Sequence, residues 1–109
     1  MKGKIVLVPF PFTDLTAAKL RPALVIYEGE RDVVAAFISS KIPSELSGVD
    51  VLITKNQCGF KKAGLKVDSV IKLDKVATVL KDLIVGELGE LDEEQRQEVN
   101  RKLKKIMEI

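Results

Sequence analysis

Two polar side chains, Arg21 and Ser39, lie at the ends of predicted strands, where catalytic and binding residues are common. Arg21 closes a polar loop just before an apolar run, and Pro22 holds its backbone extended. A guanidinium is always protonated and can fork onto two phosphate oxygens, while a serine hydroxyl donates one more hydrogen bond. If the strands that carry them are neighbours, the two could stabilise charge on one phosphate. An ion-pair role for Arg21 and a strand-end role for Ser39 also fit the sequence alone.

The composition excludes several other chemistries. The chain has no histidine and one cysteine, Cys58, so a Ser-His-Asp triad, a histidine acid–base pair and a histidine or thiolate metal site are excluded. No glycine-rich phosphate loop is present, and we expect neither a metal nor a cofactor. A single cysteine cannot form an internal disulfide, which fits a reducing, cytoplasmic location.

Short β-branched runs separated by turn residues predict an all-β barrel or sandwich. Pro9 and Pro11 should end the first strand because they lack backbone donors. One helical turn is possible within residues 41–48, and residues 82–88 could hold a further short strand near Gly86. The main strands are expected at residues 4–8, 23–27, 32–38, 49–54, 68–73 and 76–80.

The tail predicts the one long helix, over about residues 92–108. Asp92 is a favourable N-cap, and Gln95 three positions later completes a capping-box pattern. Val99, Leu103 and Ile106 form a narrow apolar stripe at helical spacing, so this helix should lie on the sheet. The 109 residues are expected to form a single domain, and no apolar run approaches the ~18 residues that would span a membrane.

The net charge of +2 is small, but its distribution is uneven. Residues 1–21 hold four basic and one acidic side chain, net +3, and residues 55–75 hold six basic and two acidic ones, net +4. A fold that brings these segments together would create a local positive face. Scattered solubilising lysines would give the same counts.

Several segments, in order and spacing, resemble the MazF/PemK family of type II toxin–antitoxin endoribonucleases, or mRNA interferases. They are VPFPFTD, RPALVI around Arg21, AAFISS ending at Ser40, DSVIKLD, and the GEL…DEEQ entry to the helix. The resemblance implies an SH3-like antiparallel β-barrel with a C-terminal helix, assembled as a homodimer. It also implies metal-independent cleavage of single-stranded RNA by 2′-OH attack, a cognate antitoxin protein, and contact with DNA only through that antitoxin.

The resemblance assigns the catalytic roles to Arg21 and Ser39. In some relatives an Arg-x-Asp pair also contributes. Here Lys72 stands in the arginine position of that pattern, and Asp74 follows as its aspartate. A lysine keeps the positive charge but lacks the forked donors of a guanidinium. Ala77 replaces an arginine common in the following strand. The residues expected to bind RNA or support the site are Phe10, Phe12, Thr13, Lys19, Ser40, Lys72 and Asp74.

A non-catalytic binding protein on the same fold is the alternative. It would be either a topoisomerase inhibitor of the CcdB type or an inactive RNA-binding relative. Resemblance to the CcdB type would imply a C-terminal Trp-Gly-Ile, which is associated with inhibition of the topoisomerase. This chain ends in Met107-Glu108-Ile109 and has no tryptophan. This difference disfavours the topoisomerase reading.

Overall fold

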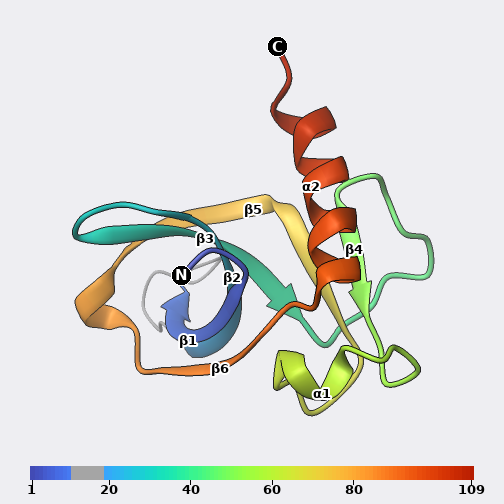
Figure 1. Ribbon diagram of the computed structural model, residues 1–109, viewed down its shortest axis with the longest axis horizontal. Helices are drawn as coiled ribbons and strands as arrows, with labels where there is room; N and C mark the ends of the chain where they lie inside the picture. Colours follow the sequence, from blue (N-terminus) through green and yellow to red (C-terminus); the bar gives the residue numbers. More distant parts are fainter. Residues whose placement is uncertain (11–18) are drawn as a thin grey trace.

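The fold is a six-stranded antiparallel sheet, curled into a half-barrel, with a helix at its C-terminal end (Figure 1). The computed structural model describes residues 1–10 and 19–109, apart from the Phe10 side chain. The strand order is β4-β5-β3-β2-β1-β6. The strands are β1 (Lys4–Phe10), β2 (Lys19–Glu28), β3 (Asp32–Ser39), β4 (Asp50–Ile53), β5 (Ser69–Leu80) and β6 (Gly86–Glu90). The helices are α1 (Phe60–Ala63), the 3-10 turn η1 (Lys81–Leu83) and α2 (Glu93–Met107).

The expected class, mostly β with a C-terminal helix, is confirmed. Asp92 caps α2, accepting a hydrogen bond from the Gln95 backbone while the Gln95 side chain accepts one from the Asp92 backbone. Of the predicted apolar stripe, Val99 is buried, and Leu103 and Ile106 pack partly buried against the same core. Within the residues that the structure describes, no helix is long and apolar enough to cross a membrane.

Several strand boundaries differ from those expected. β1 continues through Pro9, which pairs with Leu20. Only the Lys4–Leu7 part of β1 pairs with β6, so Pro9 has a neighbouring strand on one side and its missing donor disrupts one ladder at most. β2 begins at Lys19, so Arg21 lies inside a strand rather than at the end of a loop.

The two strands predicted at residues 68–73 and 76–80 are one strand, β5. Its partner β3 is continuous, and the register jumps from Ala36↔Val76 to Phe37↔Lys72. Asp74 therefore lies in a bulge, not in a turn. The helical turn considered for residues 41–48 does not form, and α1 was not predicted because four residues are too few for a helical pattern.

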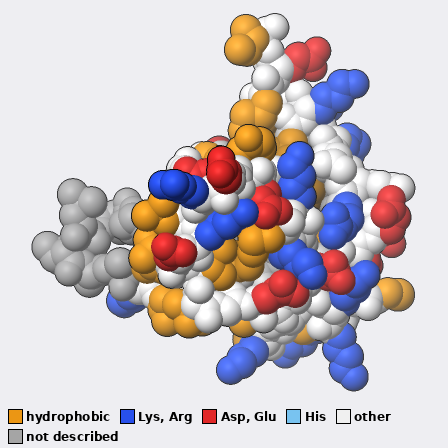
Figure 2. Space-filling view, turned by 60° about the vertical axis from the view of Figure 1, so that its left-hand side comes forward, with side chains coloured by type: hydrophobic (Ala, Val, Ile, Leu, Met, Phe, Trp, Pro, Cys, Tyr) orange, Lys and Arg blue, Asp and Glu red, His pale blue; other side chains and the backbone are white. Residues whose placement is uncertain are grey.

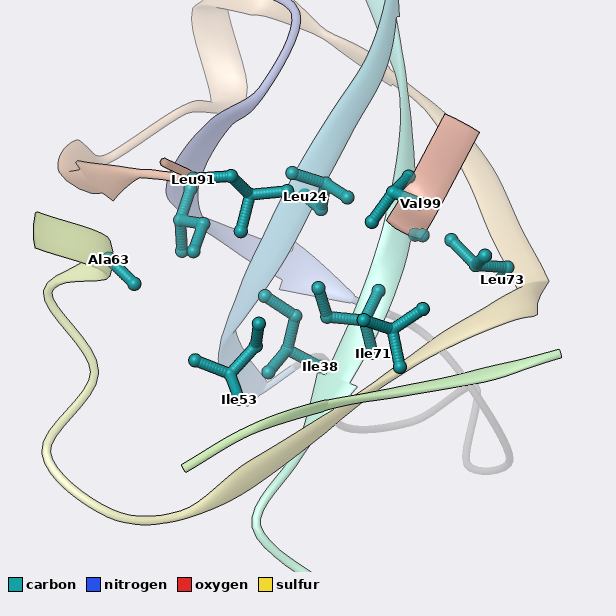
Figure 3. Packing of buried hydrophobic residues seen from close by; sticks show 11 residues of the cluster. Leu24, Ile38, Ile53, Ala63, Ile71, Leu73, Leu91 and Val99 are labelled. Carbon is teal, nitrogen blue, oxygen red and sulfur yellow. The ribbon is translucent and has the colours of Figure 1, made fainter. Parts of the chain in front are cut away.

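Apolar side chains pack on both faces of the sheet. One cluster lies between the sheet and α2, where Leu24, Ile38 and Ile71 converge toward Val99 of the helix (Figure 3). The other lies on the opposite face and is built from small β-branched residues and alanines of the first three strands and β5. Its buried members are Val6, Val8, Ala23, Val25, Val33, Ala35 and Val79. The sheet is thus fixed from both sides, and its strand ends form a rigid frame for exposed polar residues.

The segment after α1 is held against β6 by glycine. Gly64 ends α1 at a positive φ of 77°, which L side chains rarely adopt. A Cβ there would also overlap the Leu88 carbonyl oxygen of β6. This close approach brings residues 64–67 beside the open end of the sheet.

Candidate functional site

A groove of about 760 Å³ opens over the ends of β2, β3 and β5. Its walls come from strands β1, β2, β3, β5 and β6 and from the segment 64–67 that the Gly64 contact holds in place. Five of the residues expected at the site line it: Lys19, Arg21, Ser39, Ser40 and Lys72. Segments far apart in the sequence therefore meet at one surface.

Arg21 and Ser39 share this groove because of the strand register. The pairing of β2 with β3 ends at Ala23 and Phe37, and Arg21 and Ser39 each lie two residues beyond that last pair, on the same face of the sheet as the pair. Directly opposed residues in an antiparallel pair point to the same face of the sheet. Arg21 is exposed and Ser39 is half-buried. A ligand in the groove could therefore meet an exposed guanidinium and a half-buried hydroxyl.

The Ser39 hydroxyl has a defined hydrogen bond. Its oxygen accepts the backbone N–H of Lys41 at 3.0 Å. No acceptor for the hydroxyl hydrogen is found among residues 1–10 and 19–109, so that hydrogen can be donated to a ligand. The Lys41 contact fixes the oxygen while leaving its donor available.

Positive charge is concentrated in the groove. Its lining has six basic residues and, among the residues that the structure describes, no acidic one, although the whole chain carries only +2. Figure 2 shows one face of the molecule, on which basic and acidic side chains lie intermingled around apolar ones. The two basic segments noted in the sequence supply most of the lining charge. The six residues are Lys19, Arg21, Lys41, Lys66, Lys72 and Lys75.

Lys72 is the one groove cation, among the described residues, that is ion-paired. Its ammonium lies 3.4 Å from Oδ1 of Asp50, which is opposite it in the register of β4 and β5. Burial by itself would raise the pKa of Asp50, but the Ser47 backbone N–H and the Lys72 ammonium outweigh it and hold the pKa below its ordinary value. The carboxylate therefore remains charged and keeps its lysine.

Four of the expected site residues are not brought into the groove by the described structure. Asp74 is exposed in the β5 bulge and does not line the groove. Phe12, Thr13 and the Phe10 side chain lie outside the described residues. Their part in the site remains a prediction. Within residues 1–10 and 19–109, no group of three or more His, Cys, Asp or Glu side chains could hold a metal ion.

Sequence reasoning missed four residues of the site region. Lys66 and Lys75 belong to the basic segment 55–75, so its charge count was a usable signal for them. Lys41 lies in a segment of net negative charge, so the charge counts did not indicate it, although it begins the loop 41–46, which the sequence predicts to influence RNA specificity. Asp50 does not line the groove, but it holds a residue that does.

The chain belongs to the PemK-like, MazF-like toxin family of type II toxin–antitoxin systems, whose family model matches residues 1–107. A search of curated proteins returned no match.

Solved structures show the same fold at low sequence identity. A mycobacterial endoribonuclease in complex with its cognate antitoxin is 18% identical, with a TM-score of 0.72, over 98% of this chain and 93% of that one. The Mycobacterium tuberculosis toxin MazF-mt6 is 16% identical, with a TM-score of 0.74, over 97% of both chains. MazF from Deinococcus radiodurans is 20% identical, with a TM-score of 0.71, over 99% of this chain and 96% of that one.

Proposed function

We propose that this chain is the toxin of a type II toxin–antitoxin pair and a metal-independent endoribonuclease that cleaves single-stranded RNA. The observation that carries the proposal is the shared position of Arg21 and Ser39 on a groove lined by six cations. A polyanion is the natural ligand of such a surface. Membership of the toxin family makes RNA the favoured polyanion.

In the proposed reaction, the ribose 2′-oxygen attacks the adjacent phosphorus and the bond from phosphorus to the 5′-oxygen breaks. The 2′-hydroxyl loses its proton, and the departing 5′-oxygen gains one. The products are a 2′,3′-cyclic phosphate and a 5′-hydroxyl. Negative charge grows on the phosphate oxygens in the transition state, and the Arg21 guanidinium and the Ser39 hydroxyl donate to them. Donors already aimed at developing charge are often the largest single catalytic contribution.

The proposed partners follow from the same groove. An acidic segment of a cognate antitoxin would compete with RNA for the six cations, and DNA would be contacted only through that antitoxin. We also propose a homodimer. Large apolar side chains are exposed on β5, in η1 and after it, as expected for a surface that is covered by another molecule. They are Val76, Leu80, Leu83 and Val85, with exposed fractions of 41%, 54%, 48% and 61%.

The test is incubation of the purified protein with a long single-stranded RNA in the presence of EDTA. We expect fragments with cyclic phosphate ends, no cleavage by Arg21→Ala, and a rate lowered about 100-fold or more by Ser39→Ala. The matched control is Arg101→Ala on α2, which is exposed and outside the groove lining and should cleave normally.

Two results would contradict this assignment. Intact RNA with the unaltered protein would leave a non-catalytic RNA-binding protein, or, if the protein inhibits a topoisomerase, the CcdB type. Cleavage that Arg21→Ala and Ser39→Ala leave unchanged would place the active site elsewhere.

A further inference from the structure

Asp50 is a buried carboxylate beneath the groove. The residue is 2% exposed, and its Oδ2 accepts the Ser47 backbone N–H at 3.0 Å and the Ser47 hydroxyl at 3.3 Å. Its Oδ1 accepts from the Lys72 ammonium at 3.4 Å. Its backbone carbonyl accepts from Lys102 of α2 at 2.5 Å. Both the side chain and the backbone of Asp50 are therefore fixed.

A buried charge is costly unless it is paired and hydrogen-bonded. Among the described residues, Lys72 is the only cation that contacts the Asp50 carboxylate, so the burial of Asp50 depends on that lysine. The position of the Lys72 ammonium in turn depends on Asp50. A lysine side chain is long and flexible, and an anchored carboxylate restricts where its ammonium can lie. The ammonium has three donors, and Asp50 takes one of them.

The anchored ammonium lies beside the candidate catalytic pair. Lys72 of β5 pairs with Phe37 of β3. Ser39 lies two residues after Phe37 on β3, so its side chain is on the same face of the sheet. Two residues of a strand span roughly 7 Å. The Lys72 side chain is 23% exposed and lines the groove, so its two other donors can reach a ligand there.

We propose that Asp50 is a positioning residue, which fixes the Lys72 ammonium where it contacts an RNA phosphate next to the one held by Arg21 and Ser39. This inference rests on the proposed function for its substrate. Asp50 itself touches no RNA and acts only through Lys72. Lys102 secures the backbone of Asp50 and so links α2 to the groove.

The test is a double-mutant cycle with Asp50→Asn, Lys72→Met and the double variant. The asparagine keeps the shape of the side chain and can still accept the Ser47 N–H, and the methionine keeps an apolar stem without the charge. Each single variant should lower kcat/KM for RNA cleavage by between about 10-fold and 100-fold, since small misplacements of a positioned group have effects on this scale. The double variant should have the same kcat/KM as Lys72→Met, because Asp50 affects cleavage only through Lys72.

Glu94→Gln on α2 is the matched control. It makes the same change from carboxylate to amide at an exposed residue outside the groove lining, so kcat/KM should stay near that of the unaltered protein. Melting temperatures of all variants are measured alongside. If Asp50 had a purely structural role, Asp50→Asn would lower the melting temperature, and in the double variant its loss of kcat/KM would add to that of Lys72→Met. This result would overturn the inference. Normal cleavage by Asp50→Asn would also overturn it.

Binding to 2′-O-methyl RNA, which lacks the attacking hydroxyl, separates this inference from the nuclease assignment. Asp50→Asn and Lys72→Met should weaken this binding equally, whether or not the unaltered protein cleaves RNA. If cleavage fails but the two variants bind equally weakly, only the nuclease assignment is wrong. If Lys72→Met does not fold because it leaves Asp50 buried without its cation, the double variant, which has no unpaired buried charge, is compared with Asp50→Asn. A further loss in the double variant would then refute the proposal.

Discussion

Salt should weaken RNA binding by this chain steeply, and the groove lining sets the expected size of the effect. For single strands, each neutralised phosphate contributes about −0.7 to the slope of log K against log salt. Six lining cations, with Lys72 included, give a slope of about −4. Between about 50 and 200 mM salt, this corresponds to a loss of affinity of about 300-fold.

The measurement is fluorescence anisotropy with a labelled 2′-O-methyl RNA, which cannot be cleaved during the titration. Lys66→Ala removes one exposed cation from the groove lining and should reduce the magnitude of the slope by about 0.7. Lys104→Ala removes an exposed cation from α2, outside that lining, and should leave the slope unchanged. A slope no steeper than about −1 for the unaltered protein would refute the reasoning, because the six cations would then not hold the RNA backbone. Equal effects of the two lysine variants would also refute it.

Two further predictions concern stability. Hydrogen bonds from Lys81 and from the amino terminus lower the pKa of Glu28 from its ordinary 4.5 to about 2, so this group stabilises the fold above pH 4.5 and loses that contribution as the pH falls toward 2. Chemical denaturation should show Glu28→Gln less stable than the unaltered protein at neutral pH, with the difference shrinking as the pH falls from 4.5 toward 2. A difference that stays constant over this range would show that the two ion pairs are not its cause. Asp92→Ala should lower the free energy of unfolding by about 1 kcal/mol because the α2 capping box is lost, and Asp92→Asn should retain most of it. Equal losses for the two Asp92 variants would show that the cap hydrogen bond is not the cause.

Local signals in the sequence predicted the elements that depend on local interactions. The capping box at Asp92 and Gln95 uses residues three apart, and it forms as expected. The strand boundaries were less accurate because they depend on the neighbouring strand. β5 stays one strand through its bulge because β3 pairs with both of its halves, and β1 continues past Pro9 because β2 lies beside it.

The positive groove was predictable only in part. The charge counts identified two basic segments, and Lys19, Lys66 and Lys75 come from them. Whether those segments meet depends on β2, β3 and β5 being consecutive in the sheet, which is a non-local property. No count could include Lys41, whose place at the groove follows from the hydrogen bond between its backbone and Ser39.

Lys72 shows most clearly where sequence reasoning ends. In the sequence it stands where some relatives have an arginine, and its type alone suggests a weaker phosphate ligand without a fork. In the structure its environment changes that expectation, because a buried carboxylate 22 residues earlier in the chain takes one of its donors and restrains the rest. A free lysine would lose rotamer freedom on binding a phosphate, whereas an anchored one has already lost part of it. The consequence of having lysine at this position therefore depends on Asp50, and a variant that removes only the Asp50 charge measures it.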